Sequence, residues 1–173
     1  MRPIWLVYAE GFLGQREVPG PGASAWIRSM WLGLRGGSWF WTSIGKADDS
    51  KLAWCGAFIA HCFQNCHMEY AQRYASARAW LEWGTALTGP AVGAVVVFSR
   101  DGGGHVGFVH GRDTNGRLLV LGGNQGDAVS IAPFDLKRVV GYRWPEDVAL
   151  QPLVGLDTLP VYQAGGAASA NEA

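Results

Sequence analysis

Cys55 is the residue of this 173-residue chain that is best placed to act as a nucleophile. It stands at the expected first turn of an apolar helix, and the small residues Gly56 and Ala57 leave its sulfur uncovered. The positive end of a helix dipole favours the thiolate, which is the reactive form of cysteine. The preceding Asp-Asp-Ser segment, residues 48–50, offers oxygens that cap a helix start. These features predict a reactive cysteine.

The same helix also suggests a structural role for its cysteines. Cys62 and Cys66 follow Cys55 at helical spacing, and free cysteines usually pack as small apolar side chains. A metal site built from Cys62, Cys66, His61 and His67 is disfavoured, because the two histidines project from other faces of the helix. Two cysteines four residues apart on one helix are also badly placed for a disulfide. We therefore expect reduced thiols and no metal.

His105 is the histidine best placed to act as a general base for Cys55. It opens an expected strand directly after three glycines, residues 102–104, where its ring is not covered by neighbouring side chains. A cysteine nucleophile needs a base within hydrogen-bond reach. His61 and His67 lie six and twelve residues along the helix of Cys55. At about 1.5 Å of rise per residue they are too distant for a direct contact.

Asn124 is the expected third residue of the site, where it would orient the histidine ring. Asn115-Gly116 lies between two apolar runs and predicts a β-hairpin. A two-residue loop would place His105 and Asn124 on the same face of the sheet, whereas a three-residue loop would place them on opposite faces. Gln125 is a polar candidate for oxyanion contacts, but the same parity argues against its lying on that face.

The order of the expected elements indicates an α+β fold, with helices first and antiparallel strands after. Apolar residues at helical spacing predict helices over residues 4–13, from Ser24 onward, and over residues 76–84. Runs rich in β-branched residues, bounded by turn residues, predict strands. These runs cover residues 94–98, 105–110, 117–121, 129–131 and 139–144.

Composition excludes several classes of function. Fourteen basic and fourteen acidic residues cancel, which argues against binding to nucleic acid. No apolar run is long enough to span a bilayer, so no membrane insertion is expected. The N-terminal residues do not read as a secretory signal, which predicts a protein made in the cytoplasm without a signal peptide. The chain fits one domain, residues 1–147, and a partly flexible C-terminal extension, residues 148–173.

Six motifs, in this order along the chain, resemble the CHAP and NlpC superfamily of peptidoglycan-cleaving cysteine hydrolases, most closely a branch common in phages and prophages. The resemblance covers residues 4–145. The motifs are Trp54-Cys55-Gly56-Ala57-Phe58, residues 76–84, Pro90-Ala91-Val92-Gly93 before a valine-rich run, residues 104–109, Leu121-Gly122-Gly123-Asn124-Gln125 and Gly141-Tyr142-Arg143.

The resemblance implies a papain-like fold, with Cys55 as nucleophile, His105 as general base and Asn124 as orienting residue. It implies cleavage of an amide bond of the peptidoglycan stem peptide, either by an endopeptidase or by an N-acetylmuramoyl-L-alanine amidase, without a cofactor. Some CHAP enzymes bind calcium near the nucleophile, but Asp48 and Asp49 are too few for such a site. The residues expected to contact substrate are Trp39, Trp41, Trp54, Gly104 and Gln125.

The expected place of action is the cell wall, in the periplasm. A phage endolysin, a tail-associated lysin with tail proteins as partners, and an injected effector all agree with the sequence. The alternative function is a non-catalytic module, which binds the wall or builds a virion while keeping the fold. The aromatic segment 37–43, with Trp39 and Trp41, is expected to be a loop that covers the core, or else a wall of a substrate groove.

Overall fold

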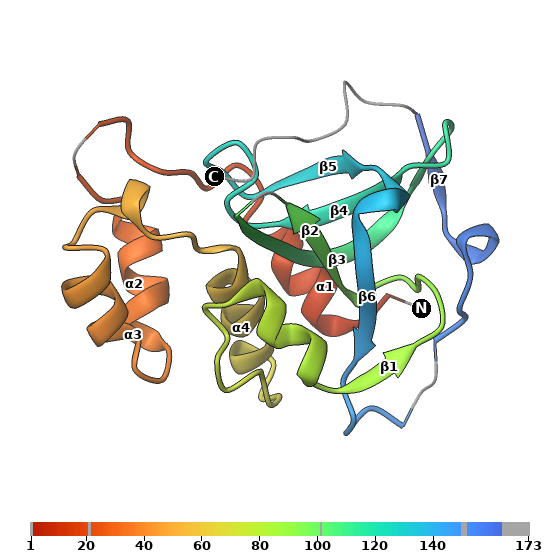
Figure 1. Cartoon of the computed structure of the whole chain (residues 1–173), viewed down its shortest axis with the longest axis horizontal. Coiled ribbons are helices and arrows are strands. Elements are labelled where there is room, and N and C mark those ends of the chain that lie inside the picture. Colours follow the sequence, from red (N-terminus) through yellow and green to blue (C-terminus); the bar gives the residue numbers. More distant parts are fainter. Residues whose placement is uncertain (1, 21, 101, 150–151, 164–173) are drawn as a thin grey trace.

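The helices come first along the chain and the strands follow (Figure 1). The computed structural model describes residues 2–20, 22–100, 102–149 and 152–163. Its α-helices are α1 (Ile4–Glu10), α2 (Ala25–Gly33), α3 (Gly37–Trp39) and α4 (Cys55–Asn65). Shorter helical turns are the π-helical η1 (Phe40–Ile44) and the 3₁₀ turns η2 (Asp49–Lys51), η3 (Ala77–Glu82), η4 (Leu136–Arg138) and η5 (Leu156–Thr158).

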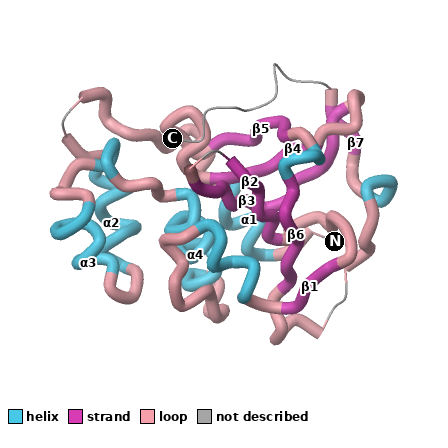
Figure 2. Tube along the Cα trace, in the orientation of Figure 1, coloured by secondary structure: helices cyan, strands magenta, loops and turns pink. Residues whose placement is uncertain are grey.

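The described strands form one sheet in the order β1-β6-β2-β3-β4-β5. All neighbours in this order are antiparallel, and β7 pairs in parallel with the end of β3. Figure 2 shows the strands gathered on one side of the molecule and most of the helical segments on the other. The bounds are β1 (Thr85–Leu87), β2 (Val95–Arg100), β3 (Gly103–Asp113), β4 (Leu118–Gly122), β5 (Ser130–Phe134), β6 (Val139–Trp144) and β7 (Val161–Tyr162).

Helix α4 lies at the centre of the hydrophobic core. In Figure 1 it stands between α2 and α3 on one side and the sheet on the other. Nearly every residue of its first nine is buried, because it packs against α1, α2 and the long strand β3. Phe63 contacts the rings of Trp83 at 4.8 Å and Phe108 at 5.4 Å between centroids. This packing fixes the helix, and therefore its first residue, against the sheet.

The small side chain of Gly56 lets the start of α4 approach the segment before η3. A Cβ atom at Gly56 would overlap the backbone oxygen of Tyr74 and lie 3.3 Å from the indole nitrogen of Trp80. That nitrogen donates a 3.0 Å hydrogen bond to the same Tyr74 oxygen. The glycine next to Cys55 is therefore required by packing.

The predicted α+β fold is confirmed, although several local predictions are wrong in detail. Helix α2 starts directly after Ser24, which caps it. The acidic segment before Cys55, however, does not cap α4: Asp48 caps the separate turn η2, and α4 begins at Cys55 after Trp54. The aromatic segment 37–43 is helical, in α3 and η1, because apolar side chains on it pack into the core.

The C-terminal part of the described chain returns to the sheet. Residues 152–160 contain the turn η5, and β7 then pairs with Arg112 and Asp113 of β3. The proposed division at residue 147 stays a prediction, and residues 150–151 and 164–173 of the predicted flexible extension lie outside the described residues. None of the helices described is long and apolar enough to span a bilayer.

Candidate active site

Cys55 is the first residue of α4, and its side chain is 5% exposed. The first intrahelical hydrogen bond runs from the Phe58 N–H to the Trp54 oxygen at 2.9 Å. The N–H groups of Cys55, Gly56 and Ala57 therefore stand outside the helical ladder, as at every helix start. Such groups can stabilise an oxyanion that forms next to the sulfur.

Burial raises the pKa of the Cys55 thiol above its ordinary value. Backbone hydrogen bonds from Val106 and Gly56, and the positive charge of Arg100, act in the opposite direction but are smaller. The helix start favours the thiolate, but desolvation by burial outweighs this effect. The contact with Val106 places the thiol beside the residue that follows His105.

His105 is held in a buried position by strand pairing and by aromatic stacking. It lies in β3 opposite Phe98 of β2 and is 1% exposed. Its ring is parallel to that of Phe134, with 5.3 Å between centroids and 3° between planes. Phe98 stacks in turn on Phe134 at 4.5 Å. The two phenyl rings restrict the plane of the imidazole, so that only its edge can exchange protons with neighbours.

Gln125 makes a direct hydrogen bond to the imidazole of His105. The Oε1 atom of Gln125 lies 3.0 Å from Nε2 of His105. The amide nitrogen of Gln125 donates to the backbone oxygens of Val120 at 3.2 Å and Ser130 at 2.8 Å, and to the Ser130 hydroxyl at 3.1 Å. These acceptors fix the orientation of the amide, so Oε1 faces the ring.

The orientation of this amide determines the tautomer of His105. A carboxamide oxygen can only accept a hydrogen bond, so Nε2 of the imidazole must carry the proton. In the neutral ring the other nitrogen, Nδ1, is then the basic one. This is the arrangement that a general base for a thiol requires, with one nitrogen anchored and the other able to take a proton.

Gln125, which was expected to face away, reaches His105 because strand β4 ends before it. Asp113 N–H bonds to the Arg117 oxygen at 2.9 Å, so the loop has three residues, the case that by itself would place His105 and Asn124 on opposite faces. A bulge between Val109 and Gly111 then restores the register. Pairing ends at Gly122 of β4, beyond which strand parity no longer governs where side chains point.

Asn124 lies in the turn that follows β4 and is buried. Its φ of 58° is in the left-handed region, which asparagine tolerates better than most residues. This turn redirects the chain so that the next side chain, Gln125, folds back over the end of the strand. Gly122 makes room for it: a Cβ there would lie 2.6 Å from Oε1 of Gln125 and 3.3 Å from Nε2 of His105. The orienting role of Asn124 stays a prediction.

The other residues expected to contact substrate have very different environments. Trp54 is fully buried and donates a 2.7 Å hydrogen bond to Glu17, and Trp41 is also buried, so both side chains are occupied by core packing. Trp39 is 57% exposed. Gly104 is partly exposed and packs against Ala77 in the segment that precedes His105. Trp39 and Gly104 therefore keep surface that a ligand could touch.

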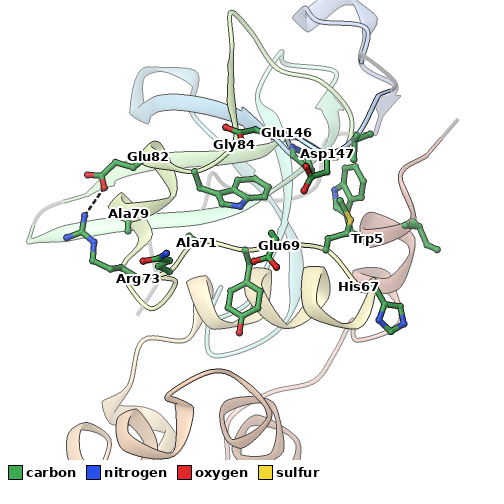
Figure 3. A pocket seen from close by; sticks show the side chains of 17 residues that line it. Trp5, His67, Glu69, Ala71, Arg73, Ala79, Glu82, Gly84, Glu146 and Asp147 are labelled. Carbon is green, nitrogen blue, oxygen red and sulfur yellow. Dashed lines mark hydrogen bonds and ion pairs between the residues drawn. The ribbon is translucent and has the colours of Figure 1, made fainter.

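Figure 3 shows a groove of about 980 Å³ at the C-terminal end of α4. It is lined by aromatic and charged residues, among them Trp5, Trp83 and the exposed ion pair of Arg73 with Glu82 at 2.9 Å. Neither Cys55 nor His105 lines it. This groove therefore does not contain the candidate nucleophile and base. We assign the candidate active site from the positions of Cys55 and His105 instead.

The cysteines and histidines of α4 beyond Cys55 do not form a metal site. Cys62 is fully buried in the core, and the ring of His61 packs between Phe12 and Trp26, 5.4 and 6.0 Å from their centroids. Among the described residues, no group of three or more His, Cys, Asp or Glu side chains is arranged to hold a metal ion.

Alkylation by iodoacetamide provides a test of the Cys55 environment. Because its pKa is raised, the thiol is protonated at neutral pH, so the alkylation rate should be low at pH 7. The rate should then rise about tenfold per pH unit until the raised pKa is passed. Peptide mass spectrometry at a series of pH values would measure it, with the unfolded chain as reference. A rate that is already constant between about pH 6 and 8 would instead indicate a preformed thiolate.

A family model matches part of the chain. The chain matches no curated protein and no solved structure. The CHAP domain matches residues 47–124, a segment that contains Cys55, His105 and Asn124 and ends just before Gln125. Together with the few helices and the antiparallel sheet, this match agrees with a papain-like α+β fold and supports the CHAP superfamily.

Proposed function

We propose that this protein is a cysteine hydrolase that cleaves an amide bond in the stem peptide of peptidoglycan. CHAP domains are typically hydrolases that act on peptidoglycan, and the match covers Cys55 and His105. The observation that carries the mechanism is the hydrogen bond between His105 and Gln125, because it leaves Nδ1 of the imidazole as the base. The general base is thus prepared before substrate arrives.

The proposed reaction has two stages. In the first, Nδ1 of His105 takes the thiol proton while the Cys55 sulfur attacks the amide carbonyl, and N–H groups at the start of α4 stabilise the oxyanion. The imidazolium then gives its proton to the leaving amine, and a thioester with the sulfur remains. In the second stage, a water molecule gives a proton to His105 and attacks the thioester, which releases the acid and restores the thiol.

We propose that Gln125 orients the imidazole of His105. The sequence had predicted this role for the neighbouring residue, Asn124. The raised pKa of Cys55 agrees with a thiol that is protonated in the resting site. Proton transfer would then accompany attack, because a bound substrate supplies the charge-stabilising environment that the resting site lacks.

We also propose a phage-associated context, as an endolysin or a tail-associated lysin that acts on the cell wall. What supports this context is the sequence resemblance to a branch common in phages and prophages.

The experiment that tests the function is mass spectrometry of purified peptidoglycan after digestion. Free lactyl-muramic acid with new alanine amino termini would identify an amidase, and split stem or cross-bridge peptides would identify an endopeptidase. Wall binding without any released fragment would favour the non-catalytic module.

A further inference from the structure

Two arginine side chains converge on Gly103 at the start of β3, two residues before His105. The Nη2 atom of Arg78 donates a 3.3 Å hydrogen bond to the Gly103 oxygen. Arg100 is paired with Gly103 in the β2–β3 ladder, and its Nε and Nη2 atoms lie 3.6 and 3.9 Å from where a Cβ of Gly103 would be. Both guanidinium groups therefore border the same short segment of backbone.

Neither arginine is neutralised within the described part of the chain. The ion pairs found there involve other cations, and none includes Arg78 or Arg100. The Nε atom of Arg100 is buried and has no hydrogen-bond partner among the described residues. A buried donor without an acceptor is costly, and a protein usually satisfies such a group with a side chain, water or ligand. These two groups are thus prepared to receive an anion.

Arg78 and Arg100 lie close to the candidate catalytic residues His105 and Cys55. Gly104 directly precedes His105, and the Cγ atom of Arg78 lies 3.5 Å from where a Cβ of Gly104 would be. The charge of Arg100 acts on the Cys55 thiol, so the guanidinium lies within electrostatic reach of the sulfur. An anion held here would belong to a substrate whose scissile amide is at Cys55.

We propose that Arg78 and Arg100 form a subsite for a free carboxylate of the stem peptide, adjacent to the amide that is cleaved. This inference rests on the proposed function. Stem peptides carry free carboxylates on their glutamate and diamino acid residues unless these are amidated. The planar guanidinium presents paired N–H donors that match the two oxygens of a carboxylate, and two such groups supply more charge than one carboxylate needs. A hydrolase built this way prefers unamidated stems.

The test compares two disaccharide pentapeptides, one with free glutamate and diaminopimelate carboxylates and one with both amidated. Wild type should cleave the free form with a kcat/KM at least about tenfold higher. Arg78→Gln should remove most of this preference by raising KM for the free form, with kcat and the amidated peptide little changed. Arg78→Lys, which keeps the charge but not the paired donors, should fall between the two.

Arg28 of α2 is exposed and provides a matched control, because Arg28→Gln makes the same change of charge away from Gly103. It should leave both KM values unchanged. Arg100→Gln is the second variant, expected to raise KM for the free form as well. Equal cleavage of both peptides by wild type, or an equal loss on both in Arg78→Gln and Arg100→Gln, would overturn the subsite while leaving the hydrolase intact. Cleavage of neither peptide by wild type would contradict both the proposed function and the proposed subsite.

Discussion

Replacing Cys55 by alanine is expected to lower the rate of stem-peptide cleavage by roughly 10⁴-fold or more. The alanine removes the sulfur that forms the thioester, and neither His105 nor the N–H groups of the helix start can replace a covalent nucleophile. Since the thiol is almost fully buried, the variant loses one sulfur atom of packing and should still fold, at a cost of about 1 kcal/mol. Release of soluble wall fragments, followed by mass spectrometry, measures the loss.

Cys66 supplies the matched control for this substitution. It is a partly exposed free cysteine at the C-terminal end of the same helix, so Cys66→Ala makes the same chemical change eleven residues away. Its activity should stay within a factor of about two of wild type. A Cys55→Ala protein that is folded, as judged by circular dichroism, and still releases fragments would refute the thioester mechanism.

The elements that build the core could be predicted from the sequence because each is long and strongly apolar. Helix α4 and strand β2 are examples: both are nearly continuous apolar runs, and both were expected within a few residues of their observed bounds. The strands β1 and β7 were not expected. They have three and two residues, which is too short for any periodicity, and they form only because β6 and β3 offer them free edges.

The catalytic roles of Cys55 and His105 stay predictions, and the hydrogen bond from His105 to Gln125 was not expected from the sequence. Counting residues back from the Asn115-Gly116 turn assumes a ladder that continues to residue 125, whereas β4 ends at Gly122. The positive φ of Asn124 then turns Gln125 inward. Neither feature leaves a signal in the pattern of apolar residues. The sequence did contain one hint, since only a glycine at position 122 leaves space for the Gln125 amide beside the imidazole.

Burial of the tryptophans that were expected to contact substrate could not be predicted from residue type either. Trp39 and Trp41 are two residues apart and equally apolar, yet one is exposed and the other buried. The difference arises because the segment is helical, so residues two apart point in different directions. Trp54 was expected near substrate, but its ring fills the space left by Gly123, where a Cβ would be 2.6 Å from the indole.

Replacing Gln125 by leucine is expected to lower kcat by roughly 10²-fold, with a smaller change in KM. Leucine has a similar volume but cannot accept the proton of His105 Nε2 or donate to Val120 and Ser130, so the ring loses the contact that sets its tautomer. The unsatisfied backbone oxygens should also cost about 1–3 kcal/mol of stability, measured by urea unfolding. Nitrogen-15 NMR of labelled histidine would report the tautomer directly, a readout that a merely structural role would not move.

Two further variants separate the contributions of neighbouring residues. Gly122→Ala keeps the Gln125 amide but places a methyl group 2.6 Å from its oxygen, so it should reproduce much of the loss in kcat. Asn124→Gly removes the neighbouring amide while retaining a residue that tolerates the φ of 58°. If Gln125 orients the base, this variant should lose less activity than Gln125→Leu, and His105 should keep its Nε2–H tautomer. A larger loss in Asn124→Gly, together with a changed tautomer, would return the orienting role to Asn124.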